Sequence, residues 1–275
     1  DLAWAAGDSQ AKGFLIGATS GRTTLNGEGL QHQDGHSHLF SATIPNCLSY
    51  DPAYAYELAV IFQHGIQKMF VDLENYYYYI TVTNENYKQP PKPQGSEEGI
   101  IKGMYQLIEK KDHQVILLGS GSILNESVKA VEILSSIGIA AEVWSVTSFN
   151  MLRKDGIDKQ RFNELHPDAT SKRSYVEECL SDASIPVIAS TDYMRAYPEQ
   201  IRGYIKAPFY TLGTDGYGRS DSREKLREFF EIDANNIARM ASYALFKKGS
   251  ITKAEINKIY KKLNVDPSKP NPWEV

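Results

Sequence analysis

The sequence predicts an α/β protein made of two compact units, with a mostly parallel mixed sheet in the second unit. Short apolar runs alternate with segments of helical periodicity, which is the pattern of strand–helix–strand units. Three prolines fall within residues 90–93, and they can neither continue a helix nor occupy a central strand. The 275 residues also exceed one average domain. We therefore expect a first unit over residues 1–87, an extended linker over 88–95 and a second unit over 96–275.

Strands and one long helix are predicted in the first unit. The apolar run Gly13–Ala18 indicates a short buried strand, and a Gly-, Asn- and His-rich loop follows it. Asp51 and Pro52 suit the N-cap and first position of a helix. The aromatic and β-branched segment Tyr76–Val82 indicates a second strand. The apolar stripe expected on the helix consists of Tyr54, Leu58, Ile61, Phe62 and Met69.

The second unit shows regular alternation of strands and helices. We expect strands at 104–108, 115–118, 139–146, 186–189 and 209–212. We expect helices near 124–134, 158–165, 174–182, 195–204, 221–231, 234–248 and 252–263. Gly138 suits the end of the first of these helices. This order predicts a sheet covered by helices on both faces.

Composition narrows the classes of function. The formal net charge is −4 and no basic block occurs, which argues against a nucleic-acid partner. No apolar run is long enough to span a membrane, and no signal peptide is recognisable. Cys47 and Cys179 are far apart in sequence, which favours a reduced, cytoplasmic setting. The start lacks methionine and resembles the end of a helix, so we expect a fragment.

The loop Gly27–His38 is the richest candidate for chemistry, since loops on rigid scaffolds often carry catalytic groups. It contains three histidines and two carboxylates: Glu28, His32, Asp34, His36 and His38. They are either ordinary polar loop residues, ligands of a metal, or a metal-free acid–base or hydrogen-bonding cluster. Glu28 precedes His32 by four residues, so both can converge on one small substrate. Spacing alone leaves these three interpretations open.

Residues 119–122, Gly-Ser-Gly-Ser, stand between a predicted strand and helix, as a phosphate-binding turn does. Leu124 replaces the third glycine of GxGxxG. A tight turn in which Ser122 or Asn125 caps the helix is therefore favoured over a nucleotide site. Asp192 follows a predicted strand without a second carboxylate beside it, so it indicates only a turn.

A second Gly-rich loop occupies Gly213–Arg223. If this loop is purely structural, Ser220 or Asp221 is expected to be the N-cap of the next helix. Its functional interpretation is a subunit contact or the rim of an active site, because Arg219 and Arg223 suit pairing with carboxylates.

Several segments together resemble the homodimeric bacterial pyruvate dehydrogenase E1 family. They occur in the family's order over essentially the whole chain. They are SGRTTLNGEGLQH (20–32), DGHSH (34–38), SYDPAYAYE (49–57), LGSGSIL (118–124), SVTSF (145–149), ASTDYM (189–194) and the loop 213–223.

This resemblance implies a transketolase-like fold, with part of a pyrimidine-binding domain followed by a transketolase C-terminal domain. It also implies an enzyme that uses thiamine diphosphate and Mg²⁺. The family's thiazolium carbanion attacks the keto carbon of pyruvate, and carbon dioxide leaves. The two-carbon unit then passes to the lipoyl group of the E2 acetyltransferase. The implied partners are lipoylated E2 and a second E1 subunit.

The resemblance also assigns site residues. His32 matches the family's active-site histidine and Glu28 an acidic residue close to it. Asp34, His36 and His38 are expected to support the site or the structure. Gln33 departs from the family, which usually has glutamate at this position.

The cofactor site itself is not expected here. The family's diphosphate- and magnesium-binding GDG…N element does not occur in the sequence, so no cofactor-binding residue or metal ligand is assigned. We expect the glutamate that activates the aminopyrimidine to lie upstream of Asp1, and this chain alone to be inactive. The alternatives are another 2-oxo acid dehydrogenase E1 or a transketolase, a non-catalytic dimerisation or assembly module, and a metallohydrolase built on residues 32–38.

Overall fold

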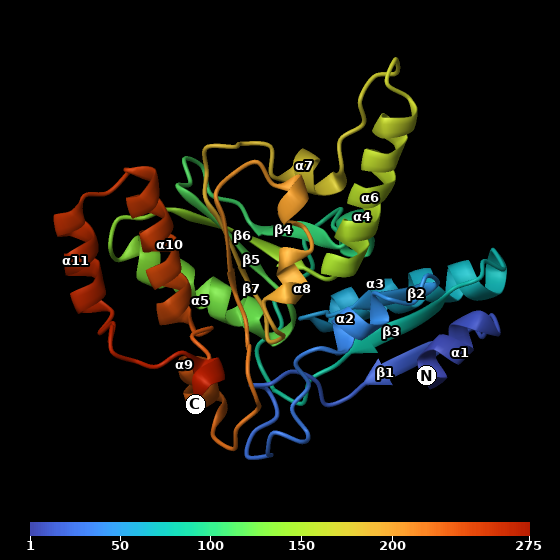
Figure 1. Ribbon diagram of the computed structural model, residues 1–275, viewed down its shortest axis with the longest axis horizontal. Coiled ribbons are helices and arrows are strands. Elements are labelled where there is room, and N and C mark those ends of the chain that lie inside the picture. The colour runs from blue at the N-terminus through green and yellow to red at the C-terminus, as the bar shows by residue number, and fades with distance from the viewer.

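The computed structural model describes residues 1–275 and contains two sheets (Figure 1). The first sheet has the order β1-β3-β2, and its strands are parallel. The second has the order β4-β6-β5-β7-β8, in which only β4 runs antiparallel to its neighbour. The strands are β1 (Phe14–Gly17), β2 (Cys47–Tyr50), β3 (Tyr77–Thr81), β4 (Met104–Ile108), β5 (Val115–Gly119), β6 (Ala141–Val146), β7 (Val187–Ser190) and β8 (Phe209–Leu212). The predicted α/β class with a mostly parallel mixed second sheet is confirmed.

Helices precede, connect and follow these strands. The α-helices are α1 (Leu2–Asp8), α2 (Ser37–Ser41), α3 (Ala55–Ile66), α4 (Glu97–Lys102), α5 (Leu124–Ser135), α6 (Phe149–Leu165), α7 (Tyr175–Cys179), α8 (Ala196–Glu199), α9 (Arg223–Phe229), α10 (Ala234–Lys248) and α11 (Lys253–Lys262). A π-helical turn, Gln67–Val71, extends α3, and short 3₁₀ turns are Gly121–Ile123, Arg202–Tyr204 and Pro272–Glu274. Neither helix nor strand occurs between Thr81 and Glu97.

The central strand β5 shows why the second sheet is buried on both faces. Successive side chains of a strand point to opposite faces. Val115 and Leu117 accordingly belong to the core beneath α5 and α10, whereas Ile116 and Leu118 belong to the core on the α6–α8 side. A strand that is apolar at every position therefore has two apolar layers to fill, as parallel sheets usually do.

The strand predicted at Gly13–Ala18 is present, but it is not buried. β1 pairs only with β3, so one of its edges is free. Leu15 and Ile16 are 49% and 42% exposed. The sequence pattern predicted the strand correctly, because extended apolar residues suit any sheet. It could not tell a central strand from an edge strand.

The predicted helix start at Asp51 is wrong. The N-cap of α3 is Tyr54, and the helix begins at Ala55, three residues after the predicted first position Pro52. Its first turn is capped by Glu57, whose Oε2 accepts hydrogen bonds from the N–H groups of Ala53 (2.6 Å) and Tyr54 (3.0 Å). Asp51 is instead buried, with 3% of the residue exposed, and its carboxylate accepts from Thr81 Oγ1 at 2.7 Å. Local propensity favoured the N-cap, and packing at the end of β2 overrode it.

Three other helix predictions need correction. α6 starts at Phe149 rather than near 158, because Ser148 caps it by accepting from the N–H of Met151. The helix expected over 195–204 divides into α8 and a 3₁₀ turn. The N-cap of α9 is Ser222, whose Oγ accepts from the N–H of Lys225, and is neither of the two residues predicted.

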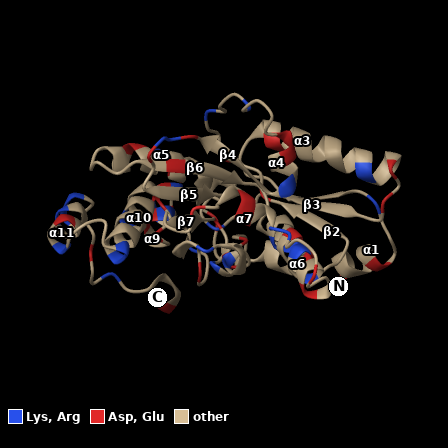
Figure 2. Cartoon of the chain, turned by 90° about the horizontal axis from the view of Figure 1, so that it is seen from above, with Lys and Arg blue, Asp and Glu red and all other residues tan.

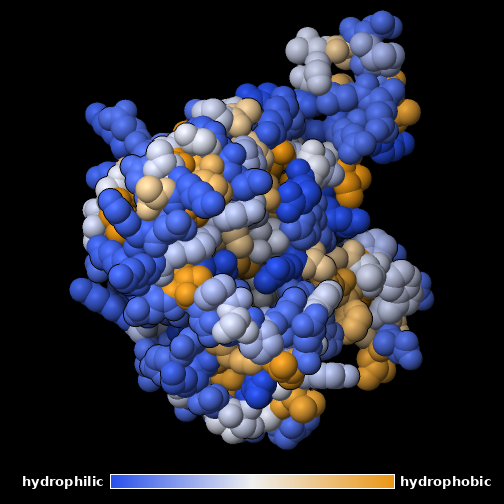
Figure 3. Space-filling model, turned by 60° about the vertical axis from the view of Figure 1, so that its left-hand side comes forward, coloured by the Kyte–Doolittle hydropathy of each residue, from blue (hydrophilic) through white to orange (hydrophobic).

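Charged side chains of both signs are interspersed over the elements (Figure 2). The face drawn in Figure 3 is mainly hydrophilic, with small separate apolar patches. No helix combines the length and the apolar character needed to cross a bilayer.

Candidate active-site loop and its anchors

The carboxyl ends of strands from both sheets lead to one buried polar region. Asp51 follows β2, Thr81 ends β3, Ser120 follows β5 and Asp192 follows β7. All four side chains are at most 3% exposed. Ligands of parallel α/β sheets bind outside this edge of the strands. The loops that leave these strand ends are therefore the natural place for a site.

Asp192 anchors the start of the loop that carries the histidines. Its carboxylate accepts from the N–H of Thr23 (3.0 and 3.2 Å), from Thr23 Oγ1 (2.7 Å) and from Thr24 Oγ1 (2.8 Å). Burial raises the pKa of Asp192, while Arg227 and these hydrogen bonds act in the opposite direction. Sequence reasoning predicted only a turn at Asp192, because its partners are about 170 residues away in the chain.

Gln33 anchors the other end of the same loop. Its side-chain amide forms two hydrogen bonds with the backbone of Arg219: Oε1 accepts from N–H, and Nε2 donates to C=O, both at 2.7 Å. Nε2 also donates to the carbonyl of Leu25 at 3.3 Å. Close by, the N–H of Met194 donates to the carbonyl of Gly35 at 2.9 Å. A side-chain amide can accept from the N–H and donate to the C=O of the same residue, whereas an ionised glutamate can only accept.

The two Gly-rich loops predicted separately therefore lie side by side, blue and orange at the bottom of Figure 1. The N–H of Gly27 donates to the carbonyl of Asp221, and Ser220 Oγ donates to the carbonyl of Glu28. Arg223 Nε donates to the carbonyl of Thr24 at 2.8 Å. The second loop thus forms part of the support of the first.

Glu28 and His32 meet at the tip of the supported loop. His32 Nδ1 lies 3.3 Å from Glu28 Oε2, and the two side chains are 60% and 50% exposed. Nε2 of His32 has no hydrogen-bond partner within the chain, so it is free to meet a ligand. The spacing of four residues therefore brings the two side chains together.

The other three candidates in the loop have different surroundings. Asp34 caps the turn into α2, because its Oδ1 accepts from the N–H groups of His36 and Ser37 at 3.0 Å. His36 is exposed and packs edge-on against Phe40. His38 is completely buried. No group of three or more His, Cys, Asp or Glu side chains is arranged to hold a metal ion.

His38 belongs to a buried chain of polar groups. Its Nε2 lies 2.9 Å from Thr81 Oγ1, which in turn donates to Asp51 Oδ1 at 2.7 Å. Its ring stacks on Tyr197 and meets Tyr193 edge-on. Burial lowers the pKa of His38 to about 3 and raises the pKa of Asp51 to about 7. Both groups are consequently neutral over much of the acidic range.

Within the chain, Arg219 and Arg223 pair with no carboxylate. Arg219 covers the ring of Phe229, with its guanidinium carbon 4.3 Å from the centroid, and Arg223 binds backbone and Asn84. Arg227 forms the ion pairs instead, with Glu85 and, at 3.3 Å, with Glu126. Side-chain type allowed the pairing, and the position of each residue, Arg219 in the loop and Arg223 and Arg227 on α9, decided it.

The predicted capping roles of Ser122 and Asn125 are also wrong. α5 has no side-chain N-cap. Ser122 Oγ instead lies 2.8 Å from Thr24 Oγ1 and so joins the anchor of the histidine loop. Ser120 Oγ donates to Thr191 Oγ1 at 2.9 Å, which links the ends of β5 and β7.

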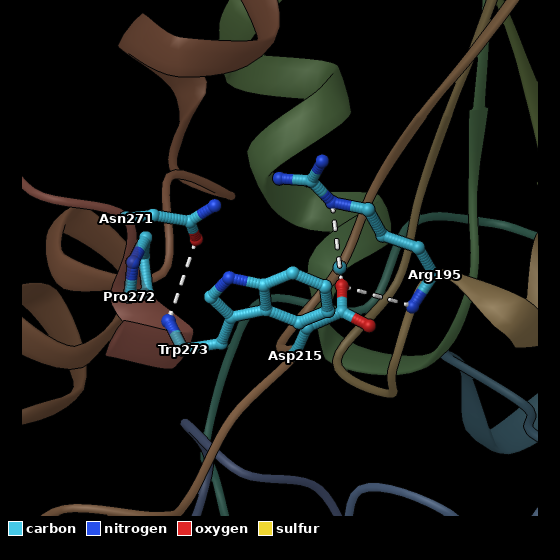
Figure 4. Close-up of a pocket in the computed structure, with 6 residues that line it drawn as sticks. Arg195, Asp215, Asn271, Pro272 and Trp273 are labelled. Atoms are coloured by element: carbon cyan, nitrogen blue, oxygen red, sulfur yellow. Dashed lines mark hydrogen bonds and ion pairs between the residues drawn. The ribbon is translucent and has the colours of Figure 1, made fainter. Parts of the chain in front are cut away.

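The C-terminal turn covers the outer side of the second loop. A small pocket of about 190 Å³ opens there between Arg195, Asp215 and Trp273, as Figure 4 shows. Arg195 Nε lies 3.3 Å from the Asp215 carboxylate. Neither Glu28 nor His32 lines this pocket. Because its arginine is already paired, the pocket adds no candidate for the chemistry.

Comparison with known proteins identifies the family. Residues 1–90 match the family model described as Pyruvate dehydrogenase E1 component middle domain. Residues 103–233 match the one described as Transketolase-like TK C-terminal domain. The Pyruvate dehydrogenase E1 component of Pseudomonas aeruginosa is 58% identical over the whole chain, and that of Escherichia coli K12 is 55% identical over 99% of it. The chain belongs to the pyruvate dehydrogenase E1 family.

Against these relatives the chain is partial, because it spans 32% and 31% of their respective lengths. The fold agrees with solved structures of transketolases. The transketolase of Campylobacter jejuni aligns with 86% of this chain and 32% of its own, with a TM-score of 0.66 and 19% identity. At that identity the likeness concerns the fold, and it confirms the transketolase-like architecture expected for the E1 family.

Proposed function

We propose that the protein to which this chain belongs is a pyruvate dehydrogenase E1 enzyme. It would decarboxylate pyruvate on thiamine diphosphate and transfer the acetyl unit to the lipoyl group of E2. The observation that carries the proposal is the Glu28–His32 pair on a loop anchored at both ends, within a chain 58% identical to a Pyruvate dehydrogenase E1 component. The implied second E1 subunit and lipoylated E2 are part of the same proposal.

His32 would be the group of this chain that acts on the reactants. Its Nδ1 faces Glu28 at 3.3 Å, which orients the ring and leaves Nε2 for the substrate carboxylate or the developing oxyanion. A histidine in that place can also hold and return a proton. Glu28 would orient the ring, whereas Asp34, His36 and His38 would support the loop and the core beneath it.

The residues of this chain do not fit the diphosphate and magnesium by themselves. The chain has no GDG…N element, and no cluster of three or more metal-ligating side chains forms in it. We propose that the main site of the cofactor lies in the part of the relatives' length that this chain does not span.

The division into residues 1–87, a linker at 88–95 and residues 96–275 is part of the proposal. The absence of helix and strand between Thr81 and Glu97 supports it. In this view the first unit carries His32, and the second unit holds the loop in place through Asp192 and Arg219.

The first experiment is His32→Ala in the intact protein, assayed with pyruvate and a lipoylated E2 acceptor. We expect the rate of reductive acetylation to fall by about 10²- to 10⁴-fold, which is the usual contribution of a general acid–base group. His166→Ala is the control, because that histidine is exposed at the end of α6, outside the loop, and its loss is expected to change the rate little. Normal turnover after His32→Ala would remove His32 from the chemistry.

A substrate panel separates the proposal from its neighbours. The intact protein should use pyruvate in preference to 2-oxoglutarate and to ketose phosphates, whereas a transketolase would show the reverse for ketose phosphates. Calorimetric titration of this chain with thiamine diphosphate and magnesium is expected to show no tight binding. Tight, stoichiometric binding would contradict the cofactor assignment.

A further inference from the structure

The loop that carries His32 is held by two anchors, and both are side chains that take no part in the chemistry assigned above. Between Thr24 and Gln33 the chain extends away from the buried region, and Asn26, Gly27 and Glu28 are exposed. The loop contains glycines and no strand or helix of its own. Its geometry therefore depends on the points at which other segments hold it.

The first anchor is the carboxylate of Asp192, which its surroundings hold in one position. Its carboxylate is fully buried and bound by Thr23 and Thr24, and Thr24 Oγ1 also contacts Ser122 Oγ at 2.8 Å. A Cβ on Gly21 would lie 2.2 Å from Asp192 Oδ2, so only glycine allows this approach. Arg227, ion-paired with Glu85 and Glu126, contributes the positive charge that offsets the buried carboxylate.

The second anchor is the pairing of Gln33 with Arg219. Gln33 is 5% exposed, and its amide satisfies both the N–H and the C=O of Arg219. A Cβ on Gly218 would lie 2.4 Å from Gln33 Oε1, so this contact is also close. Gln33 directly follows His32, so a shift at this anchor passes directly to the histidine.

We propose that Asp192 and Gln33 are positioning residues of the reaction, which fix the loop so that His32 presents Nε2 in one place. This inference rests on the proposed function of His32. Asp192 comes from the unit opposite the histidine, so the position of the histidine depends on the contact between the two units. A displacement of about 1 Å in a reacting group can lower a rate about 100-fold.

The test is a double-mutant cycle in the intact protein with Asp192→Asn and His32→Ala. The asparagine keeps the volume of the side chain but turns one acceptor oxygen into a donor that faces hydroxyl and N–H groups. We expect kcat for reductive acetylation to fall by about 10- to 100-fold, with KM for pyruvate within about twofold. In the His32→Ala background the same change should cost less than about twofold.

Ser242→Ala is the control for a buried polar change elsewhere. Its hydroxyl bonds only to the carbonyl of Ala238 within α10, so kcat should be unchanged. Should Asp192→Asn fail to fold, Thr24→Val and Thr24→Ser give the same comparison. Valine removes the hydroxyl that Asp192 binds and should lower kcat, and serine retains it and should restore kcat.

The outcomes separate this inference from the proposed function. If His32→Ala leaves turnover normal, the role of the histidine fails. If His32→Ala lowers turnover but Asp192→Asn has no effect on kcat, the positioning role is overturned. It is equally overturned if the loss from Asp192→Asn persists in full when His32 is absent, since the carboxylate would then act independently of the histidine.

Discussion

Asp51 offers a direct test of how burial controls ionisation at the strand ends. Burial raises its pKa from 3.8 to about 7. The folded protein therefore holds a proton on Asp51 that the unfolded chain has released between these two values. In a pH range where the folded state binds more protons than the unfolded state, the free energy of unfolding falls as pH rises. The raised pKa of Asp51 therefore does not lower the free energy of unfolding below about pH 4. Between about pH 4 and pH 7 the loss of stability grows with pH, and above about pH 7 it stays constant.

The size of this effect follows from the shift. About three pH units correspond to about 4 kcal/mol in full, of which about 2.5 kcal/mol develops between pH 5 and pH 8. Asp51→Asn should remove it, because the amide keeps an oxygen to accept from Thr81 Oγ1 and does not ionise. We therefore expect the free energy of unfolding of the variant, relative to that of the wild type, to rise by about 2.5 kcal/mol between pH 5 and pH 8.

The comparison must be made against the wild type, because His38 acts in the opposite direction. Its pKa is lowered from 6.5 to about 3, so stability is lost as pH falls below about 6.5. The two neighbours therefore mask one another in a single pH profile. Urea denaturation of the chain and of Asp51→Asn at pH 5 and pH 8 isolates the carboxyl. Asp182→Asn is the control, since that carboxylate is on the surface and its pKa is lowered. A stability difference between variant and wild type that stays constant or shrinks with pH would refute the reasoning.

Two further predictions concern packing, and both are measured by urea denaturation of the chain. Gly21→Ala should destabilise it by at least about 2 kcal/mol, since φ is +89° and the new Cβ would overlap the Asp192 carboxylate. Gly27→Ala has a similar φ of +77° with no atom within 4 Å of the new Cβ, so it should cost only about 1 kcal/mol, and equal losses would rule out the overlap. Leu117→Ala, fully buried on β5, should cost about 2–5 kcal/mol. Leu165→Ala, 56% exposed, should stay within about 0.5 kcal/mol, and comparable losses at both leucines would contradict the burial assigned to β5.

The anchors suggest why the two Gly-rich loops appear in one family pattern although nearly 190 residues separate them. Gln33 and Arg219 are 186 positions apart, and Thr23 and Asp192 are 169 positions apart. In sequence, each loop alone shows little more than turn-forming residues. Together they form one supported surface, with His32 at its exposed tip.

The sequence by itself predicted seven of the eight strands, the longer helices and the mostly parallel character of the second sheet. It did not predict β2 (Cys47–Tyr50) or the short helices α2 and α4. Runs such as Val115–Gly119 are apolar at every position, and this pattern favours a strand with two buried faces, although β1 shows that it also occurs in an exposed edge strand. The spacing of Glu28 and His32 likewise determined that they can meet. Local chain geometry is enough for both conclusions, because the interacting groups are near in sequence.

Only the tertiary structure decided which polar residues carry the loop. Asp51 looks like an N-cap in sequence but lies buried beside Thr81. Asp192 looks like a turn residue but binds the start of the histidine loop. Arg227, and not Arg219 or Arg223, forms the ion pairs. Burial and partners set the charge and role of such groups, and both arise when distant strand ends meet. A local sequence pattern does not predict which distant strand ends come together.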